Sequence, residues 1–395
     1  RFNFHVGPDA IVEDLPVGVQ QRVEIIQALA RDADILVFDE PTAALTPQET
    51  DELMGIMKQL RDEGKAIVFI THKLREVRAI ADKITVIRLG QVVGEAEPAS
   101  TDAELASMMV GRAVQLTVDK GAAVLSNNRL DVRDLTVASD DGQVLVDNLS
   151  FTVQGGQVLA VAGVQGNGQT ELTEALLGLE AHVTGSITLD GVEMVGKTPQ
   201  AMLDAGIGFV PEDRSHDGLV GAFTVAENLM LNRLSGPPFV KHGALQRGYR
   251  DKFAEEKIRE YDIRTQGITA RVGRLSGGNQ QKVVIARELS KDLRLLVAAQ
   301  PTRGVDVGSI EFIHKQIIAT RDAGIPVVVV STELDEAVAL ADQIMVMYRG
   351  GIVGIVPADT PRDMLGLMMA GIAPDTAKPP VGSAPTPDSA EGVQA

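Results

Sequence analysis

The sequence predicts an α/β protein with two related halves, each built on a mostly parallel sheet. Short apolar runs have the length and the β-branched content of strands that are buried on both faces; they span 35–38, 66–70, 158–162, 293–298 and 327–330. Amphipathic patterns with helical spacing lie between these runs, for example over 46–61 and 283–290. Because strands alternate with helices along the chain, we expect parallel strand pairing.

An internal repeat organises the chain. Several segments recur after about 260 residues, and a constant spacing of this kind indicates a duplicated structural unit. The aligned pairs are 15–21 with 275–281, 39–42 with 299–302, 71–74 with 332–334, and 108–111 with 368–371. In this alignment Glu333 lies opposite His72. We therefore predict a tandem duplication of one domain.

The repeat also predicts the domain boundaries. The first domain would cover 1–118, a polar linker 119–129, and the second domain 130–372. The glycine-rich segment that starts at Gly163 has no first-copy counterpart, because that position would precede Arg1. We therefore expect the first domain to be incomplete at its N-terminus. The segment 373–395 is rich in Pro, Ala, Ser and acidic residues, which predicts a disordered tail.

Composition excludes several classes of function. The net charge of −17 disfavours a nucleic-acid partner, because such proteins need a basic face for the phosphates. The chain has no cysteine, so disulfides, thiolate metal sites and cysteine nucleophiles are excluded. No run approaches the roughly 18 apolar residues that are needed to cross a bilayer, and no signal peptide is visible.

The apolar run 35–38 is followed by two acids, Asp39 and Glu40. In a nucleotide hydrolase, Asp39 in this position would hold Mg²⁺ through its water shell, and Glu40 would polarise the attacking water. Alone the pattern is weak, because most such runs are simply strand ends. It becomes specific because Pro-Thr follows and the next strand ends at His72, which could reach a γ-phosphate. Glu40 and His72 are the predicted catalytic residues.

The segment Leu-Ser-Gly-Gly-Asn-Gln-Gln at 275–281 is a candidate anion site at the start of a helix, which we predict from about Lys282. Glycines let backbone N–H groups approach an anion, a serine adds a hydroxyl, and the helix N-terminus adds partial positive charge. The alternative is an ordinary helix cap on a glycine turn. The candidate nucleotide-binding residues are Ser276, Gly277, Gly278 and Gln280.

A glycine-rich loop follows the apolar run 158–162 and precedes a helical pattern, as in a phosphate-binding loop. Gln169 stands where that pattern has lysine, so a positive charge toward the β- and γ-phosphates is missing, while Thr170 still offers Mg²⁺ a hydroxyl. The candidate nucleotide-binding residues of this loop are Gly163, Gly166, Gly168, Gln169, Thr170 and Glu171.

Together these motifs resemble the ABC ATPase family of P-loop NTPases, over roughly residues 9–371. The duplicated arrangement is similar to the single-chain ATPase subunit of simple-sugar and nucleoside importers. The residues of the loops resemble those of the nucleoside branch more closely. The resemblance implies tandem P-loop domains with a helical signature subdomain, ATP and Mg²⁺ as ligands, and a loop at 208–214 that senses the permease. It also implies two integral-membrane permease subunits, an indirect substrate-binding lipoprotein or periplasmic protein, and a peripheral place on the cytoplasmic face of the membrane.

The two halves differ in their motifs. We call the segment 275–281 the second signature and its counterpart 15–21 the first signature, which carries Pro16 and Val17 in place of serine and glycine. The counterpart of the acid pair Asp39-Glu40 reads Ala299-Gln300. Family members pack their halves head to tail, so the resemblance implies that the damaged signature faces the loop that carries Gln169. The intact second signature would then face the site that contains Glu40. We therefore predict one competent and one degenerate site; whether the degenerate site binds ATP stays open, and random decay is the alternative explanation.

Two other classes of protein remain as alternatives. A remnant or regulatory ABC protein would no longer hydrolyse ATP, but the intact Asp39, Glu40, His72 and Ser276 disfavour it. A soluble ABC protein acting on ribosomes or DNA would also have tandem halves, yet it should carry a basic linker and two competent sites.

Overall fold

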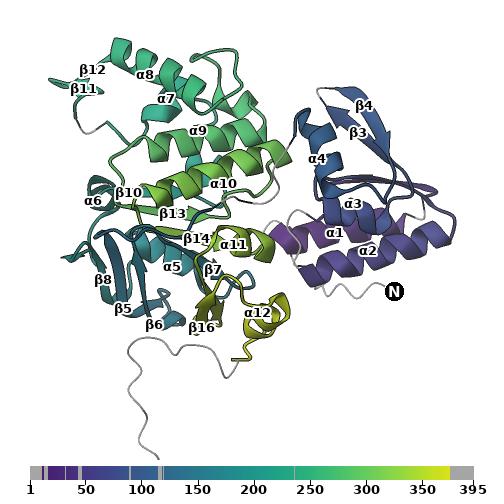
Figure 1. The fold of residues 1–395 in the computed structure, drawn as a ribbon, viewed down its shortest axis with the longest axis horizontal. Coiled ribbons are helices and arrows are strands. Elements are labelled where there is room, and N and C mark those ends of the chain that lie inside the picture. The colour runs from purple at the N-terminus through teal and green to yellow at the C-terminus, as the bar shows by residue number, and fades with distance from the viewer. Residues whose placement is uncertain are drawn as a thin grey trace, which may run out of the picture. The chain divides into compact units, whose positions relative to one another are not determined.

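The computed structural model describes most of the chain, and it is α/β, as predicted. The described residues are 11–12, 17–31, 33–42, 47–88, 90–113, 118, 120–234 and 236–373. They form two compact units (Figure 1). The first unit comprises Arg1–Thr117 and Thr302–Phe312, and the second comprises Val118–Pro301 and Ile313–Ala395. The division falls between Thr117 and Val118, and it also assigns 302–312 to the first unit, which was not expected.

The first unit contains two small sheets and four helices among its described residues up to 113. Strand β1 pairs in parallel with β2, and β3 pairs with β4 as an antiparallel hairpin. The elements are α1 (Val17–Ala30), β1 (Ile35–Asp39), α2 (Pro47–Asp62), β2 (Ala66–Ile70), α3 (Leu74–Ile80), β3 (Ile84–Arg88), β4 (Gln91–Ala96) and α4 (Asp102–Val110).

The sheet of β1 and β2 is covered on one face only by the described residues of this unit. Successive strand residues point to opposite faces. Leu36 and Phe38 accordingly pack into a core with residues of α1, α2 and α3, whereas Ile35 is 66% and Val37 63% exposed. The sequence predicted strands buried on both faces, and for β1 and β2 this expectation is wrong within the described residues.

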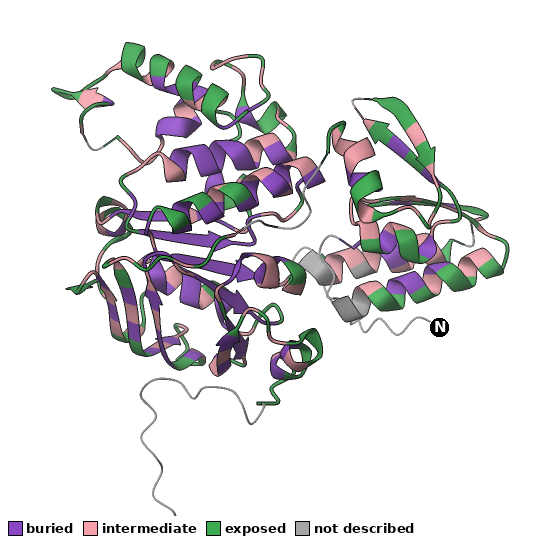
Figure 2. Cartoon of the chain, viewed as in Figure 1, coloured by how far each residue is buried: buried purple, intermediate pink, exposed green. Residues whose placement is uncertain are grey.

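The second unit is built on a six-stranded sheet with the order β10-β13-β14-β7-β15-β16. All neighbouring pairs are parallel except β15 with β16. The strands are β7 (Val158–Ala162), β10 (Ile207–Val210), β13 (Leu295–Ala299), β14 (Val327–Ser331), β15 (Gln343–Tyr348) and β16 (Gly351–Pro357). Every residue of β7, β13 and β14 is buried, and all of them except Ser331 are apolar, which produces the purple centre of Figure 2.

An antiparallel sheet and several helices surround this central sheet. The antiparallel sheet shares one apolar core with the central strands and with α5. Helix α9 packs against β10 and α7, and α8 packs against α7, which gives a helical layer on the other side of the sheet (Figure 1). The elements are β5 (Arg129–Ala138), β6 (Val144–Gln154), α5 (Gln169–Leu176), β8 (Val183–Leu189), β9 (Val192–Glu193), α6 (Pro199–Asp204), α7 (Val225–Met230), β11 (Val240–Lys241), β12 (Ala244–Leu245), α8 (Arg247–Glu260), α9 (Gly277–Leu289), α10 (Val307–Asp322), α11 (Leu334–Leu340) and α12 (Arg362–Met369).

Elements of the first unit recur later in the chain after about 260 residues, with nearly the same bounds. Helices α2 and α10 have equal length, and so do α3 and α11. The β3–β4 hairpin has a bulge between Val86 and Ile87, and the β15–β16 hairpin has one between Val346 and Met347. Because bulges depend on local sequence, their equivalent placement is a detailed structural correspondence.

The segment predicted as a polar linker lies against the second unit in its described part. The Arg321 guanidinium, which is 0% exposed, donates to the Gly121 carbonyl at 2.6 Å, and the Ser126 hydroxyl donates to the Gly324 carbonyl at 2.6 Å. Strand β5 then begins at Arg129, one residue earlier than expected. Residues 374–395, and with them most of the predicted tail, lie outside the described part of the chain. None of the described helices is long and apolar enough to span a membrane.

Candidate functional site

Glu40 and His72 lie together in the first unit, at the ends of the two parallel strands β1 and β2. Nδ1 of His72 is 2.8 Å from Oε1 of Glu40, so the imidazole can donate to the carboxylate. Glu40 has a φ of 48°, and its N–H donates to the Ile70 carbonyl at 2.9 Å. This left-handed turn directs the chain away from the strand immediately after Asp39. The structure thus brings the two predicted catalytic residues into contact.

The second carboxylate oxygen of Glu40, Oε2, is buried and has no hydrogen-bond partner among the described residues. A buried acceptor without a partner is costly, and such groups are typical of sites that receive a ligand or water. The turn itself is held from α1, because Gln21 Nε2 donates to the Glu40 carbonyl at 3.0 Å. The arrangement leaves one acceptor of a positioned carboxylate without a described donor.

Asp39 is exposed at the end of β1, where a carboxylate could hold Mg²⁺ through its water shell. The described residues contain no cluster of three or more acidic or histidine side chains that could bind a metal by themselves. This donor set fits Mg²⁺, which is usually held by one or two carboxylates together with waters and phosphates.

Glu76 forms buried hydrogen bonds beside the site, and this role was not predicted from the sequence. Its carboxylate is buried and accepts from the Thr42 hydroxyl at 2.7 Å and from the Thr71 hydroxyl at 3.0 Å. These bonds fix the residues that follow Glu40 relative to those that precede His72. The signal in the sequence was an acid at the same place in both repeats, since Glu336 accepts from the Ser331 hydroxyl at 2.7 Å in the second unit.

The second unit repeats this geometry with different side chains. Gln300 has a φ of 46°, and its N–H donates to the Val330 carbonyl at 2.8 Å. Its side-chain oxygen accepts from the N–H and the hydroxyl of Thr332 at 3.3 and 3.2 Å. The group that corresponds to the Glu40 carboxylate is therefore the amide of Gln300, and Thr332 donates hydrogen bonds to its oxygen.

The alignment of His72 with Glu333 is wrong by one residue. Ser331 Oγ accepts from the Glu333 N–H at 3.1 Å, and Thr71 Oγ1 accepts from the Lys73 N–H at 3.1 Å. The hydrogen bonds at the strand ends therefore match Ser331 to Thr71, and Thr332 is the counterpart of His72. At the position of the imidazole the second unit has a threonine and no carboxylate.

The glycine-rich loop at 163–171 has the expected setting. It joins the end of β7 to the start of α5, and Gly166 and Gly168 have positive φ values of 85° and 95°, which favour glycine. Thr170 is exposed, whereas the Gln169 side chain is buried and bonds to the loop itself. Glu171 follows on α5, and its Oε2 is buried without a described partner.

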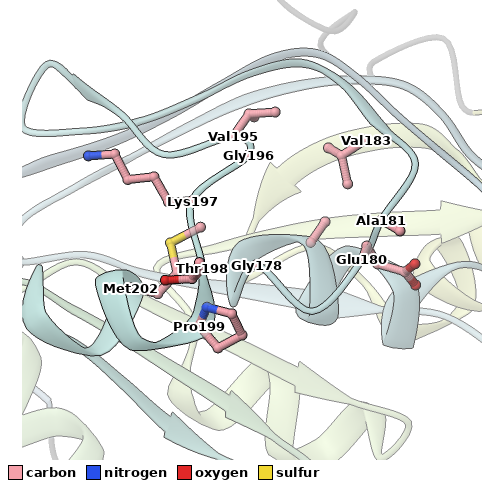
Figure 3. Close-up of a pocket in the computed structure, with 11 residues that line it drawn as sticks. Gly178, Glu180, Ala181, Val183, Val195, Gly196, Lys197, Thr198, Pro199 and Met202 are labelled. Carbon is pink, nitrogen blue, oxygen red and sulfur yellow. The ribbon is translucent and has the colours of Figure 1, made fainter.

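Residues 191–198 also match the spacing Gly-x4-Gly-Lys-Thr of a phosphate loop, but they form a different structure. A short antiparallel strand, β9, lies between the two glycines, and Thr198 accepts from the Ala201 N–H as the cap of the six-residue helix α6. Lys197 and Thr198 line a shallow pocket of about 320 Å³, with Glu180 on its opposite side (Figure 3). This segment is not a strand–loop–helix site for phosphates.

The second signature lies at the start of α9, which begins at Gly277 rather than near Lys282. Glycine is a poor former of helix interiors, and Ser276, which takes the N-cap position, makes no side-chain capping bond. Ser276 is exposed, and its hydroxyl accepts from Asn279 Nδ2 at 2.8 Å. Gly278 is buried, and Gln280 Nε2 donates to the Val272 carbonyl at 3.3 Å. The first signature at Leu15 and Pro16 lies outside the described residues.

A buried charge cluster connects α9 with the segment that was predicted to sense the permease. Glu288, 2% exposed, accepts from Arg287 Nε at 2.7 Å, from Lys291, and from the Phe209 N–H at 3.2 Å. Burial disfavours the charged form, yet the Arg287 and Lys291 cations outweigh it and hold the pKa of Glu288 below its ordinary value of 4.5. Arg287 also donates to the Gly218 carbonyl at 2.7 Å, at the end of the π-helix that follows the loop.

Comparison with known proteins decides the family. The sequence profile named ABC transporter matches residues 146–303. The chain is 47% identical to the nucleoside import ATP-binding protein NupA of Lactococcus lactis, over 94% of this chain and 74% of that protein. The chain belongs to the ATP-binding proteins of ABC importers. This family consists of ATPases that act in sugar and nucleoside import.

Other relatives in this family differ in the cargo that their names give. The guanosine import ATP-binding protein NupO of Bacillus subtilis is 46% identical over 94% of this chain and 73% of that protein. The glucose import ATP-binding protein TsgD13 of Haloferax volcanii is 43% identical over 94% of this chain and 68% of that protein. A solved ATP-binding cassette dimer bound to ADP and Pi has a TM-score of 0.51 at 22% identity, and it covers 59% of this chain and all of its own. That likeness supports the ABC ATPase fold.

Proposed function

We propose that this chain is the ATP-hydrolysing subunit of an importer and that hydrolysis takes place at the site of Glu40 and His72. The observation that carries the proposal is the carboxylate of Glu40. One oxygen is held by His72 and the other is buried without a described partner. Glu40 would polarise the attacking water, and His72 would orient Glu40 while its ring edge contacts the γ-phosphate. Bound Mg²⁺, with Asp39 in its outer shell, would neutralise charge on the phosphates.

We further propose that the chain contains two copies of one domain, the second of which is degenerate. The recurring element bounds and the equivalent bulges support the duplication. Gln300 supports the loss of activity, because an amide cannot accept a proton from water and its oxygen is already engaged by Thr332. The domain boundaries near 118 and 129 follow from the same repeat.

The intact signature of the second copy is proposed to complete the competent site. Ser276 is exposed at the N-terminus of a 13-residue helix, where partial positive charge favours an anion. The hydroxyl of Ser276 and the backbone of Gly277 and Gly278 would contact the γ-phosphate of ATP at the Glu40 site, as the family resemblance implies. Gln280 holds the turn before the helix through the Val272 carbonyl.

Exchange of Ser276 for arginine is expected to lower ATP turnover by a factor of about 100 or more, because bulk is placed where the phosphate must dock. Turnover is measured on the protein assembled with its permease. The control is Arg264→Lys, at an exposed position near Asn279, which should leave turnover within about twofold. An unaffected rate in the Ser276 variant would contradict the role of the signature.

The cargo is proposed to be a nucleoside, with a simple sugar as the alternative. The names of NupA and NupO, which specify nucleoside and guanosine import, and the Gly-Asn-Gly-Gln ending of the loop at 166–169 support this choice. Uptake of labelled guanosine and of labelled glucose by cells that lack the gene would decide it. Loss of glucose uptake alone would refute the nucleoside assignment.

The partners are proposed to be two permease subunits, served by a substrate-binding lipoprotein or periplasmic protein, with the ATPase at the cytoplasmic face of the membrane. A cavity of about 580 Å³ lies beside the charge cluster, and Asn232 and Lys291 line it. Asn232 Nδ2 donates to Glu288 Oε1 at 2.9 Å. A permease segment in this cavity would therefore contact residues that are bonded to the signature helix α9.

A further inference from the structure

The side chain of Gln169 closes the phosphate loop of the second unit on itself. Its Oε1 accepts from the Asn167 N–H at 3.1 Å, and its Nε2 donates to the Val164 carbonyl at 3.1 Å. The side chain is buried, with 6% of the residue exposed. Both hydrogen-bonding ends of the amide are thus engaged by the backbone of the loop that a nucleotide would have to enter.

The amide also occupies the interior of the loop. A Cβ atom built on Gly163 would lie 2.4 Å from Gln169 Nε2, so the amide lies directly against the first glycine of the motif. Phosphate loops work because their N–H groups converge on an anion and a lysine reaches over it. Here one of those N–H groups, that of Asn167, already has an acceptor, and the residue in the lysine position carries no charge.

Two further contacts hold the closed loop in place. The Asn167 carbonyl accepts from the Gly350 N–H at 3.1 Å, and its side-chain oxygen accepts from the Arg349 N–H at 2.9 Å. Both donors lie at the turn between β15 and β16. The loop therefore has its own set of partners within the second unit and does not depend on phosphate for its conformation.

We propose that Gln169 is a built-in closure of the second phosphate loop and that this loop does not bind nucleoside triphosphate. This inference rests on the proposed function, because it specifies the state of the degenerate site. Entry of a triphosphate would break two hydrogen bonds of Gln169 and would gain no cation in return. The second copy would then contribute its signature and its fold to the importer, while its own loop stays empty throughout the cycle.

Nucleotide binding to the 395-residue chain tests the proposal, since the loop at 163–171 is present in it. Titration of Mg-ATP in a calorimeter is expected to give no saturable binding by the wild-type chain up to about 1 mM. Gln169→Lys opens the closure and adds the missing charge, and it is expected to bind at least about tenfold more tightly. Binding by the wild-type chain within about threefold of the lysine variant would overturn the proposal, as would no binding by the lysine variant.

The matched control is Gln165→Lys, which adds the same charge to an exposed position of the same loop. It should bind ATP no better than the wild type; binding equal to that of Gln169→Lys would mean that charge alone, and no closure, decides affinity. Amide exchange gives a readout that needs no ligand. Gln169→Ala should speed exchange at the Asn167 N–H by about tenfold or more, because that N–H loses its acceptor.

An unchanged exchange rate at Asn167 would overturn the closure even if the binding results agreed with it. Failure of this inference is distinguishable from failure of the proposed function. Turnover at the Glu40 site is measured separately in the assembled importer, and it does not require an empty second loop.

Discussion

Exchange of Glu40 for glutamine is expected to lower the ATP turnover of the assembled importer by about 100-fold or more. Loss of one positioned catalytic group typically costs about 2–4 kcal/mol of transition-state stabilisation. Glutamine keeps the size of the side chain, and its amide oxygen can still accept from His72, so the turn should be preserved. What is lost is the ability of the second oxygen to take a proton from water. Steady-state phosphate release measures the effect.

Gln300→Ala provides the control, because it removes the corresponding side chain of the second unit. Its oxygen bonds only to Thr332 in the described structure, and turnover should stay within about twofold of wild type. A glutamine variant of Glu40 that retains half of the wild-type rate would refute the assignment of the catalytic site. A collapse of turnover in the Gln300 variant would show that the second site is catalytic as well.

Removal of the Glu288 carboxylate, as in Glu288→Ala, is expected to cost about 3–5 kcal/mol of folding stability. Breaking a buried ion pair leaves its partners charged and unsatisfied, which is more costly than the pair is favourable. Arg287 and Lys291 would both lose this carboxylate, although Arg287 keeps the Gly218 carbonyl. The Phe209 N–H and the Asn232 amide would lose their acceptor. Urea unfolding of the 395-residue chain, followed by circular dichroism, measures the change.

The control for this prediction is Glu255→Ala, an exposed glutamate on α8, which should change stability by less than about 0.5 kcal/mol. A change of similar size in both variants would contradict the special role of Glu288. The pH dependence follows from the lowered pKa. As the pH falls, Glu288 is protonated in the unfolded chain before it is protonated in the folded chain. The stabilisation is therefore complete above a pH of about 4.5 and is lost as the pH falls through the folded-state pKa. The wild type should therefore lose more stability than the alanine variant below this pH.

Much of the fold could be predicted because periodicity and repetition both carry physical information. The strand at 66–70 and the strand at 158–162 were predicted with the bounds that the structure has, since apolar runs of this length suit parallel strands, although only the second is buried on both faces among the described residues. The positions of Glu40 and His72 at neighbouring strand ends followed from parallel pairing alone. Local spacing is sufficient for such features.

What could not be predicted depends on hydrogen bonds between residues that are distant in sequence. The register that matches Thr332 to His72 is fixed by hydrogen bonds of Ser331 to Glu333 and Glu336. A sequence alignment does not detect such bonds. The start of α9 was misplaced because two glycines oppose a helix by propensity, whereas the tertiary contacts of α9 override it. The hydrogen bonds of Gln169 to its own loop could not be predicted either, because the absence of a lysine does not indicate what the glutamine side chain bonds to.

The left-handed turn at the end of β13 has the same backbone geometry as the turn at Glu40, although its side chain is an amide and not an acid. Gln300 keeps a φ of 46° although it has no carboxylate, so the turn belongs to the strand end and its bond to the Val330 carbonyl. In the genetic code glutamine and glutamate differ by a single base. Acid and amide can therefore be exchanged at this position, and at Glu40, by one point mutation without rebuilding the backbone. Asymmetry of this kind between the two units is easy to acquire in evolution, because each unit keeps a scaffold that can carry either side chain.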